Sequence, residues 1–321
     1  MAVCDGGKQL SITIIGPERP DPVLPQLLKR DGIRGPVALI SAGWRQDEAR
    51  DEPLRAALGV TVHNLGVYRA FQEVERHAPE LARAYTKKQA ELQKLRQGYH
   101  DAIVAGLAGC MKLYSNKRDL ECPWFKQAVA HLRDVDALWL AEADRLHQGF
   151  EEEVHPFRHR LVRAEIARIA DILRGCEAVL IAGGHVGVLR NRMFFFGLDR
   201  ILRNQRIYAW SGGAMVLCDR ILLYHDFTPY GVGTAEVLDR GMGLVPGLWL
   251  LAHARQRLNM ANHDALAVMV ARLGPQRVIG LENGAILEGS NCESRGRAES
   301  AFEFQKDGSV RDLGSGDAAR T

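Results

Sequence analysis

The stretch RIYAWSGGAMVLCDRI, residues 206–221, decides both the fold and the chemistry expected of this chain. It places Ser211 between an apolar strand over residues 207–210 and a helix that begins near Met215. The small residues at 212–214 let the backbone turn sharply, so that the serine is presented at the carboxyl end of the strand. This pattern is typical of a nucleophile elbow, and an ordinary strand-to-helix turn with a serine N-cap gives the same pattern.

Composition restricts the class of protein. The chain has 321 residues, 46% of them hydrophobic, and a formal net charge of +3 that is spread along its length. No basic patch points to nucleic acid, no apolar run has the length of a membrane span, and the first ten residues lack a secretory signal. Six scattered cysteines without a CxxC pair favour neither a disulfide framework nor a zinc site. We therefore expect a cytoplasmic globular protein without a cofactor.

Strand and helix patterns alternate along much of the chain. Apolar strands are predicted at 10–16, 36–43, 60–67 and 177–184, with helix-compatible segments between them. Alternation of this kind predicts an α/β fold with a mostly parallel sheet and helices on its faces.

A helical insertion is predicted at about 70–150, where strand patterns vanish and apolar residues recur at helical spacing. It is interpreted as a cover for one sheet face, with a lid or a homodimer contact as alternatives. Residues 1–289 are expected to form one catalytic domain that includes this insertion. Residues 290–321 are expected to add a short β segment and a disordered tail.

Three titratable residues are the candidate partners of Ser211. His253 and Glu282 follow apolar runs at the ends of predicted strands, and Asp226 follows a third run. A serine nucleophile needs a base and an acid that orients this base, so the three residues are expected on one side of a single sheet. Taken singly, each also fits a structural role in a cap, core or turn.

The segment IAGGHVGVL, residues 181–189, supplies candidate oxyanion donors. Two glycines at a strand end can bring backbone N–H groups close to a bound carbonyl, so Gly184 or His185 is expected to donate beside Gly212. The segment is neither G-x-G-x-x-G nor a P-loop, which argues against nucleotide binding. The acidic and histidine-containing stretch at 151–159 fits a solvated helix start better than a metal site.

In order and rough spacing, the motifs IAGGHVGVL, AWSGGAM, GMGLVPGLWLLAHARQRL and IGLENGAIL resemble the serine peptidase family of dipeptidase E and cyanophycinase. That family belongs to the class I glutamine-amidotransferase-like superfamily. The resemblance covers roughly residues 177–289. It implies a flavodoxin-like three-layer sandwich and a hydrolase of small peptides, aspartyl or β-aspartyl ones among them.

The resemblance also implies roles for particular residues. The run GMGLVPG precedes His253 as it precedes the catalytic histidine of the family, and Gln256 and Arg257 match a Gln-Arg pair associated with substrate binding. Glu282 matches the acid of the cyanophycinase-like pattern, and Asp226 matches the arrangement in dipeptidase E. Glu282 is the preferred third member of a Ser-His-Glu triad.

Departures from the family pattern leave the substrate open. His185 and Val186 stand where the family loop usually has Asp or Asn followed by Gln or Thr, and the insertion at about 70–150 has no counterpart in compact members. The cysteine nucleophile of glutamine amidotransferases argues against that activity here, because this chain has Ser211 at the elbow. An α/β-hydrolase-type esterase and a non-catalytic flavodoxin-like binding module remain as alternatives.

Overall fold

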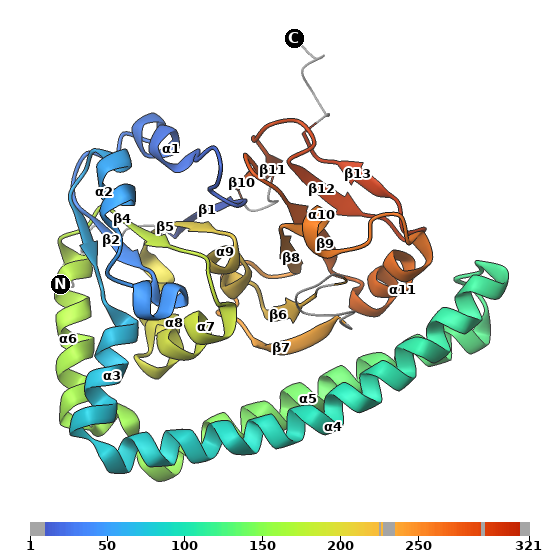
Figure 1. Ribbon diagram of the computed structural model, residues 1–321, viewed down its shortest axis with the longest axis horizontal. Helices are drawn as coiled ribbons and strands as arrows, with labels where there is room; N and C mark the ends of the chain where they lie inside the picture. Colours follow the sequence, from blue (N-terminus) through green and yellow to red (C-terminus); the bar gives the residue numbers. More distant parts are fainter. Residues whose placement is uncertain (1–9, 225, 227–234, 290–292, 315–321) are drawn as a thin grey trace, which may run out of the picture.

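The computed structural model describes residues 10–224, 226, 235–289 and 293–314 (Figure 1). Its largest sheet has seven strands in the order β11-β10-β1-β5-β4-β2-β3. Strands β1 to β5 run parallel to one another, whereas β10 is antiparallel to β1 and β11 to β10. The bounds are β1 Ser11–Ile15, β2 Val37–Ile40, β3 Val62–Asn64, β4 Ala178–Ile181, β5 Arg206–Trp210, β10 Ile286–Glu288 and β11 Glu293–Ser294.

Helices cover both faces of this sheet. Alternate residues of β4 belong to different cores: Ala178 and Leu180 pack with α1 (Leu24–Arg30) and α2 (Glu52–Leu58), and Val179 and Ile181 pack with helices of the other face. The second layer of helices includes α3 (Val67–His77), α6 (Arg160–Arg174), α7 (Val186–Phe195) and α9 (Gly212–Leu217). The expected three-layer α/β sandwich is confirmed. The order β3-β2-β4-β5 is that of a flavodoxin-like sheet, with the N-terminal β1 as the fifth parallel strand.

A second sheet, of four strands, corrects the expectation that one sheet carries all the candidate residues. Its order is β13-β12-β9-β8, with β8 parallel to β9 and the other pairs antiparallel. The chain crosses from β9 to β10 of the first sheet within the segment 282–285, so these two strands pair in different sheets. The bounds are β8 Leu248–Ala252, β9 Arg277–Leu281, β12 Ala301–Phe304 and β13 Val310–Asp312.

The C-terminal segment is part of this second sheet. Strand β12 pairs with β9, so the described residues after 290 contribute to the core around Phe302. The tail at 315–321, expected to be disordered, lies outside the described residues. A third, two-stranded antiparallel sheet consists of β6 (Arg220–Leu223) and β7 (Glu236–Arg240).

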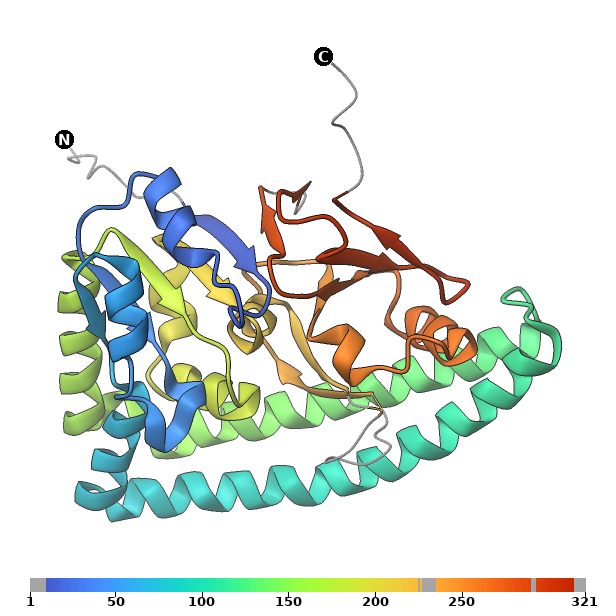
Figure 2. The ribbon, with the colours of Figure 1, turned by 45° about the horizontal axis from the view of Figure 1, so that its top comes forward.

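Two long antiparallel helices form the predicted helical insertion. They are α4 (Pro79–Lys117, 39 residues) and α5 (Pro123–Val154, 32 residues), and Figures 1 and 2 show this hairpin running along one side of the molecule, from α3 past α11 (His263–Leu273). Tyr99 and Trp139 stack between the two helices with their ring centroids 5.4 Å apart. The remaining helical segments are η1 (Ala42–Asp47), η2 (Pro156–Arg158), α8 (Leu198–Ile201), η3 (Leu202–Asn204) and α10 (Ala254–Arg257).

Despite their length, neither α4 nor α5 has the apolar character of a membrane span, and the same holds for every other helix in the described part of the chain.

Candidate active site

Ser211 occupies a sharp turn between β5 and α9. Its backbone has φ of 51° and ψ of −123°, a conformation that non-glycine residues rarely adopt. The Ser211 N–H donates to the carbonyl of Ile15 at 3.2 Å, which ties the turn to the end of the neighbouring strand β1. This is the geometry of a nucleophile elbow, because the strained turn lifts the side chain from the carboxyl end of the sheet.

His253 approaches Ser211 from the second sheet. It follows β8 directly, in left-handed backbone conformation, and its N–H donates to the carbonyl of Leu281 at the end of β9. Its Nε2 lies 3.4 Å from Ser211 Oγ, although 42 residues separate the two in the chain. The structure therefore brings the predicted nucleophile and base together across the junction of the two sheets.

The surroundings of His253 favour a neutral imidazole. Burial and the nearby charge of Arg257 lower the pKa of His253, while a hydrogen bond with the Gln256 side chain acts in the opposite direction. A neutral imidazole at neutral pH is the form that accepts a proton from a serine. Gln256, expected to bind substrate, thus contacts the candidate base.

The two candidate acids hold the turn after His253 and do not contact its imidazole among the hydrogen bonds of the described residues. Glu282 Oε1 accepts from the Arg255 N–H at 2.7 Å, and burial raises the pKa of the Glu282 carboxyl. Asp226 Oδ2 accepts from the Asn259 N–H at 2.8 Å, beyond the end of α10. Glu282 therefore binds the turn two residues after His253, whereas Asp226 binds it six residues after His253.

The loop between β4 and α7, residues 182–185, packs closely against Ser211. A Cβ placed on Gly183 would lie 2.8 Å from Ser211 Cβ and 3.1 Å from the Gly212 nitrogen, so only glycine allows this approach. The N–H groups of Gly184 and Gly212 have no acceptor among the described residues, which leaves both free to bind an oxyanion.

His185 does not fit the donor role expected of it. Its N–H donates to the carbonyl of Gly43 at 2.8 Å, and its Nδ1 accepts from the Val188 N–H as the N-cap of α7. Both groups are thus engaged in holding the loop. The second donor is assigned to Gly184 for this reason.

The segment η1 after β2 was not expected near the site. A Cβ on Gly43 would lie 2.6 Å from the carbonyl oxygen of Gly183, so η1 packs directly against the loop that faces Ser211. The letters SAGW at a predicted strand end are the only sequence pattern that marks this segment.

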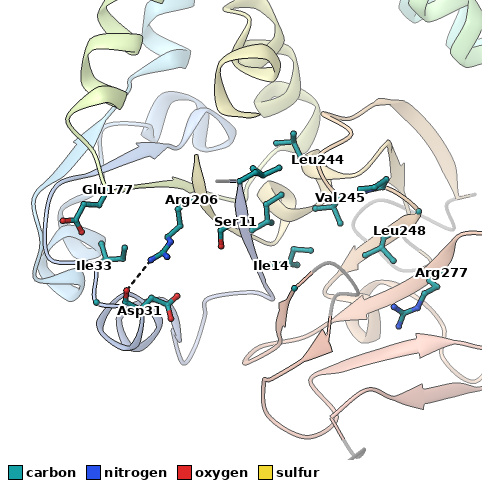
Figure 3. A pocket seen from close by; sticks show the side chains of 16 residues that line it. Ser11, Ile14, Asp31, Ile33, Glu177, Arg206, Leu244, Val245, Leu248 and Arg277 are labelled. Atoms are coloured by element: carbon teal, nitrogen blue, oxygen red, sulfur yellow. Dashed lines mark hydrogen bonds between the residues drawn. The ribbon is translucent and has the colours of Figure 1, made fainter. Parts of the chain in front are cut away.

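A cavity of about 1340 Å³ lies elsewhere (Figure 3). It is bordered by residues at the amino ends of strands, such as Ser11, Arg206, Leu248 and Arg277. In Figure 3 the Arg206 side chain reaches toward Asp31, whose carbonyl oxygen accepts from it at 3.3 Å. Because Ser211 follows a carboxyl strand end, this cavity is on the opposite edge of the sheets and is separate from the candidate site.

No cluster of three or more His, Cys, Asp or Glu side chains suited to a metal ion occurs in the described ranges. The histidines at 155 and 159 flank the short helix η2, each just outside a longer helix. They therefore do not share a helix face.

Comparison with known proteins finds distant structural similarity only. No family model and no curated protein matches the chain. A crystal structure of a peptidase from an acI-B1 Actinobacterium is similar over 98% of this chain and 98% of its own, with 11% identity and a TM-score of 0.48. A candidate Peptidase E protein from Listeria monocytogenes EGD-e is similar over 89% of this chain and 97% of its own, with 11% identity and a TM-score of 0.42. Similarity at this level leaves the function to be argued from the site itself.

Proposed function

We propose that the chain is a serine hydrolase that cleaves an amide bond in a small peptide through an acyl-enzyme. The observation that carries this proposal is the meeting of Ser211, in its strained turn, with His253 Nε2 at 3.4 Å from a different sheet. A structural serine needs neither the turn nor the histidine, whereas a nucleophile needs both. The distance is at the long end for a hydrogen bond, as is usual for catalytic pairs before substrate binds.

The reaction follows from these positions. Ser211 Oγ attacks the carbonyl carbon of the scissile bond as its proton passes to His253 Nε2, and the N–H groups of Gly184 and Gly212 stabilise the oxyanion. His253 then gives this proton to the leaving amine, so the amide C–N bond breaks and an acyl-enzyme remains. Water, deprotonated by the same imidazole, hydrolyses the ester and frees Ser211.

Glu282 is the proposed acid of the triad. Its carboxylate holds the Arg255 N–H at 2.7 Å and so fixes the turn on which His253 stands. Asp226 is the alternative acid, acting through Asn259 at the other end of the same turn.

Gln256 and Arg257 remain the proposed substrate-binding residues of α10. Arg257 is exposed beside His253 and carries a charge that suits a substrate carboxylate. This choice favours aspartyl or β-aspartyl peptides, in line with the family resemblance.

A fluorophosphonate probe tests the proposal, because it labels an activated serine whatever the natural substrate is. We expect labelling of the unmodified protein, none in Ser211→Ala, and full labelling in the control Ser309→Ala, whose hydroxyl lies in an exposed turn. Ser211→Ala should also lower peptide turnover by several orders of magnitude with the fold intact. An unmodified protein that does not label would instead support the non-catalytic binding module.

A further inference from the structure

Arg45 shares with Ser211 an unusual backbone conformation. It lies within η1 with φ of 58° and ψ of −121°, against 51° and −123° for Ser211. Arg118, His155 and His253 also have positive φ, but theirs is the ordinary left-handed conformation, with ψ of 35°, 51° and 37°. A side chain at this φ and ψ is energetically costly, and glycine would occupy the turn more readily. An arginine at this strained position therefore suggests that its side chain has a function.

The turn that carries Arg45 is continuous with the candidate site. Gly43, two residues earlier, accepts the His185 N–H at 2.8 Å and packs against the Gly183 carbonyl. Gly183 in turn lies against Ser211. The turn follows β2, which neighbours β4 where the strand order reverses, and ligands of open α/β sheets bind at such a reversal, beyond the carboxyl ends of the strands.

The guanidinium of Arg45 is free to bind an anion. The Arg45 side chain is exposed, and its guanidinium forms no hydrogen bond or ion pair with any described residue, whereas its backbone carbonyl accepts the Glu48 N–H at 3.0 Å. The acids beside it in sequence are engaged elsewhere: Asp47 pairs with Arg50 at 3.1 Å, and Glu48 is buried and accepts the N–H groups at the start of α3. Guanidinium binds carboxylates through two parallel hydrogen bonds, so its natural ligand here is a carboxylate.

We propose that Arg45 is a specificity-determining residue that binds a carboxylate of the substrate on the η1 side of Ser211. This assignment rests on the proposed hydrolase function and extends it. Arg257 lies on the second-sheet side of the same junction, so the two arginines recognise anionic groups from different sheets. The substrate class is then an acidic peptide that carries two carboxylates.

The test compares Arg45→Gly and Arg45→Lys with the control Arg50→Gly, which removes another exposed arginine shortly after η1. Three quantities are measured in each variant: the rate of fluorophosphonate labelling, the midpoint of thermal unfolding, and kcat/KM for an acidic peptide and its neutral amide analogue. Glycine relieves the backbone, so Arg45→Gly should unfold at the same or a higher temperature. It should lose roughly 10-fold or more in kcat/KM for the acidic peptide, and labelling and the neutral peptide should stay within about twofold.

Arg45→Lys keeps the charge without the paired geometry, so it should lose selectivity for the acidic peptide as well. Equal losses for the acidic and neutral peptides, or no loss for either, would overturn the role of Arg45 while labelling at Ser211 still upheld the hydrolase. Failure of the unmodified protein to label would overturn the hydrolase proposal and this assignment together.

Discussion

The backbone of Ser211 is strained, and contacts with the surrounding residues hold it in this conformation. Conformations of this kind cost about 1–3 kcal/mol and persist only where the structure around them enforces the geometry. At Ser211 the enforcing contacts are the hydrogen bond to Ile15 and the close approach of Gly183. Glycine would fit the turn with less strain, so the serine here supports the proposed role of its hydroxyl.

The lowered pKa of His253 predicts how activity depends on pH. Both burial and the charge of Arg257 move this pKa below its ordinary value of 6.5, so the proton-accepting form persists to lower pH. The acidic limb of kcat/KM should therefore fall below pH 6.5. Arg257→Gln removes one of the lowering influences, and the limb should move to higher pH.

Arg255→Gln is the matched control for this profile. The Arg255 guanidinium lies over the Phe302 ring, 4.4 Å from its centroid, and does not contribute to the pKa shift of His253. In Arg255→Gln the acidic limb of the kcat/KM profile should lie at the same pH as in the unmodified protein. Equal movement in both variants, or none in Arg257→Gln, would contradict the assignment of the limb to His253.

Glu282 and Asp226 can be separated by amide substitution. In Glu282→Gln the side-chain oxygen can still accept from the Arg255 N–H, so the turn is kept and only the negative charge that a triad acid supplies to the imidazolium is lost. We expect kcat to fall roughly 100-fold or more in this variant and less than about 10-fold in Asp226→Asn. Steady-state kinetics on variants with unchanged circular dichroism would measure this, and comparable losses would transfer the role to Asp226.

Among the elements, the α4–α5 hairpin is fixed to the body by a buried charge network. Arg272 of α11 donates through Nε to Asp136 of α5 at 2.8 Å and through Nη1 to the Ala235 carbonyl at 2.6 Å. The Tyr99 hydroxyl of α4 donates to Asp136 at 2.7 Å and accepts the Val237 N–H at 2.8 Å. Arg272 also donates through Nη2 to the Tyr99 hydroxyl at 3.0 Å, so one arginine of α11 connects both hairpin helices to the segment that begins β7.

Arg272→Met should destabilise the protein strongly, because it leaves the Asp136 carboxylate buried without its partner. We expect a loss of about 3–5 kcal/mol in the free energy of unfolding, and a smaller loss in the double variant Arg272→Met with Asp136→Leu. Denaturant unfolding measures both. The exposed pair Arg76–Glu73 on α3 is the control: Arg76→Met should cost less than about 1 kcal/mol. Equal costs at the two sites would mean that the buried network does not anchor the hairpin.

At the scale of the whole molecule, the candidate site lies where the two sheets meet. Ser211 comes from the first sheet and His253 from the second, and Glu282 begins the segment that joins them. The Gly16 N–H donates to the Ala285 carbonyl at 3.0 Å next to the β1–β10 pairing, and this bond holds the joining segment to the first sheet. The distance between nucleophile and base therefore depends on how the sheets are held against each other.

Gly16→Ala tests this dependence. A Cβ on Gly16 would lie 2.0 Å from the carbonyl oxygen of Glu282, so the backbones must move apart. We expect a loss of about 1–3 kcal/mol in stability, from overpacking, and a lower rate of fluorophosphonate labelling at Ser211. Gly98→Ala on α4 is the control, because nothing lies within 4 Å of its Cβ and the helix should gain about 0.5–1 kcal/mol. Unchanged labelling and stability in Gly16→Ala would show that the junction does not set the site geometry.

The sequence by itself determined the local features of this protein. Apolar patterns predicted the five parallel strands of the first sheet, helical spacing predicted the insertion that forms α4 and α5, and the letters around Ser211 predicted the sharp turn. These features depend on residues close together in the chain, where side-chain size and hydrophobic period act directly on the backbone.

Only the tertiary structure decided how these elements pair. Strand patterns do not reveal which strands pair with which, because pairing depends on packing between distant segments, and so β8 and β9 formed a second sheet. The same long-range packing gave the His185 N–H to Gly43 and brought the strained Arg45 turn beside the loop that faces Ser211. The acceptor of a loop N–H depends on which distant segment packs beside it, so it is known only once the tertiary structure is known.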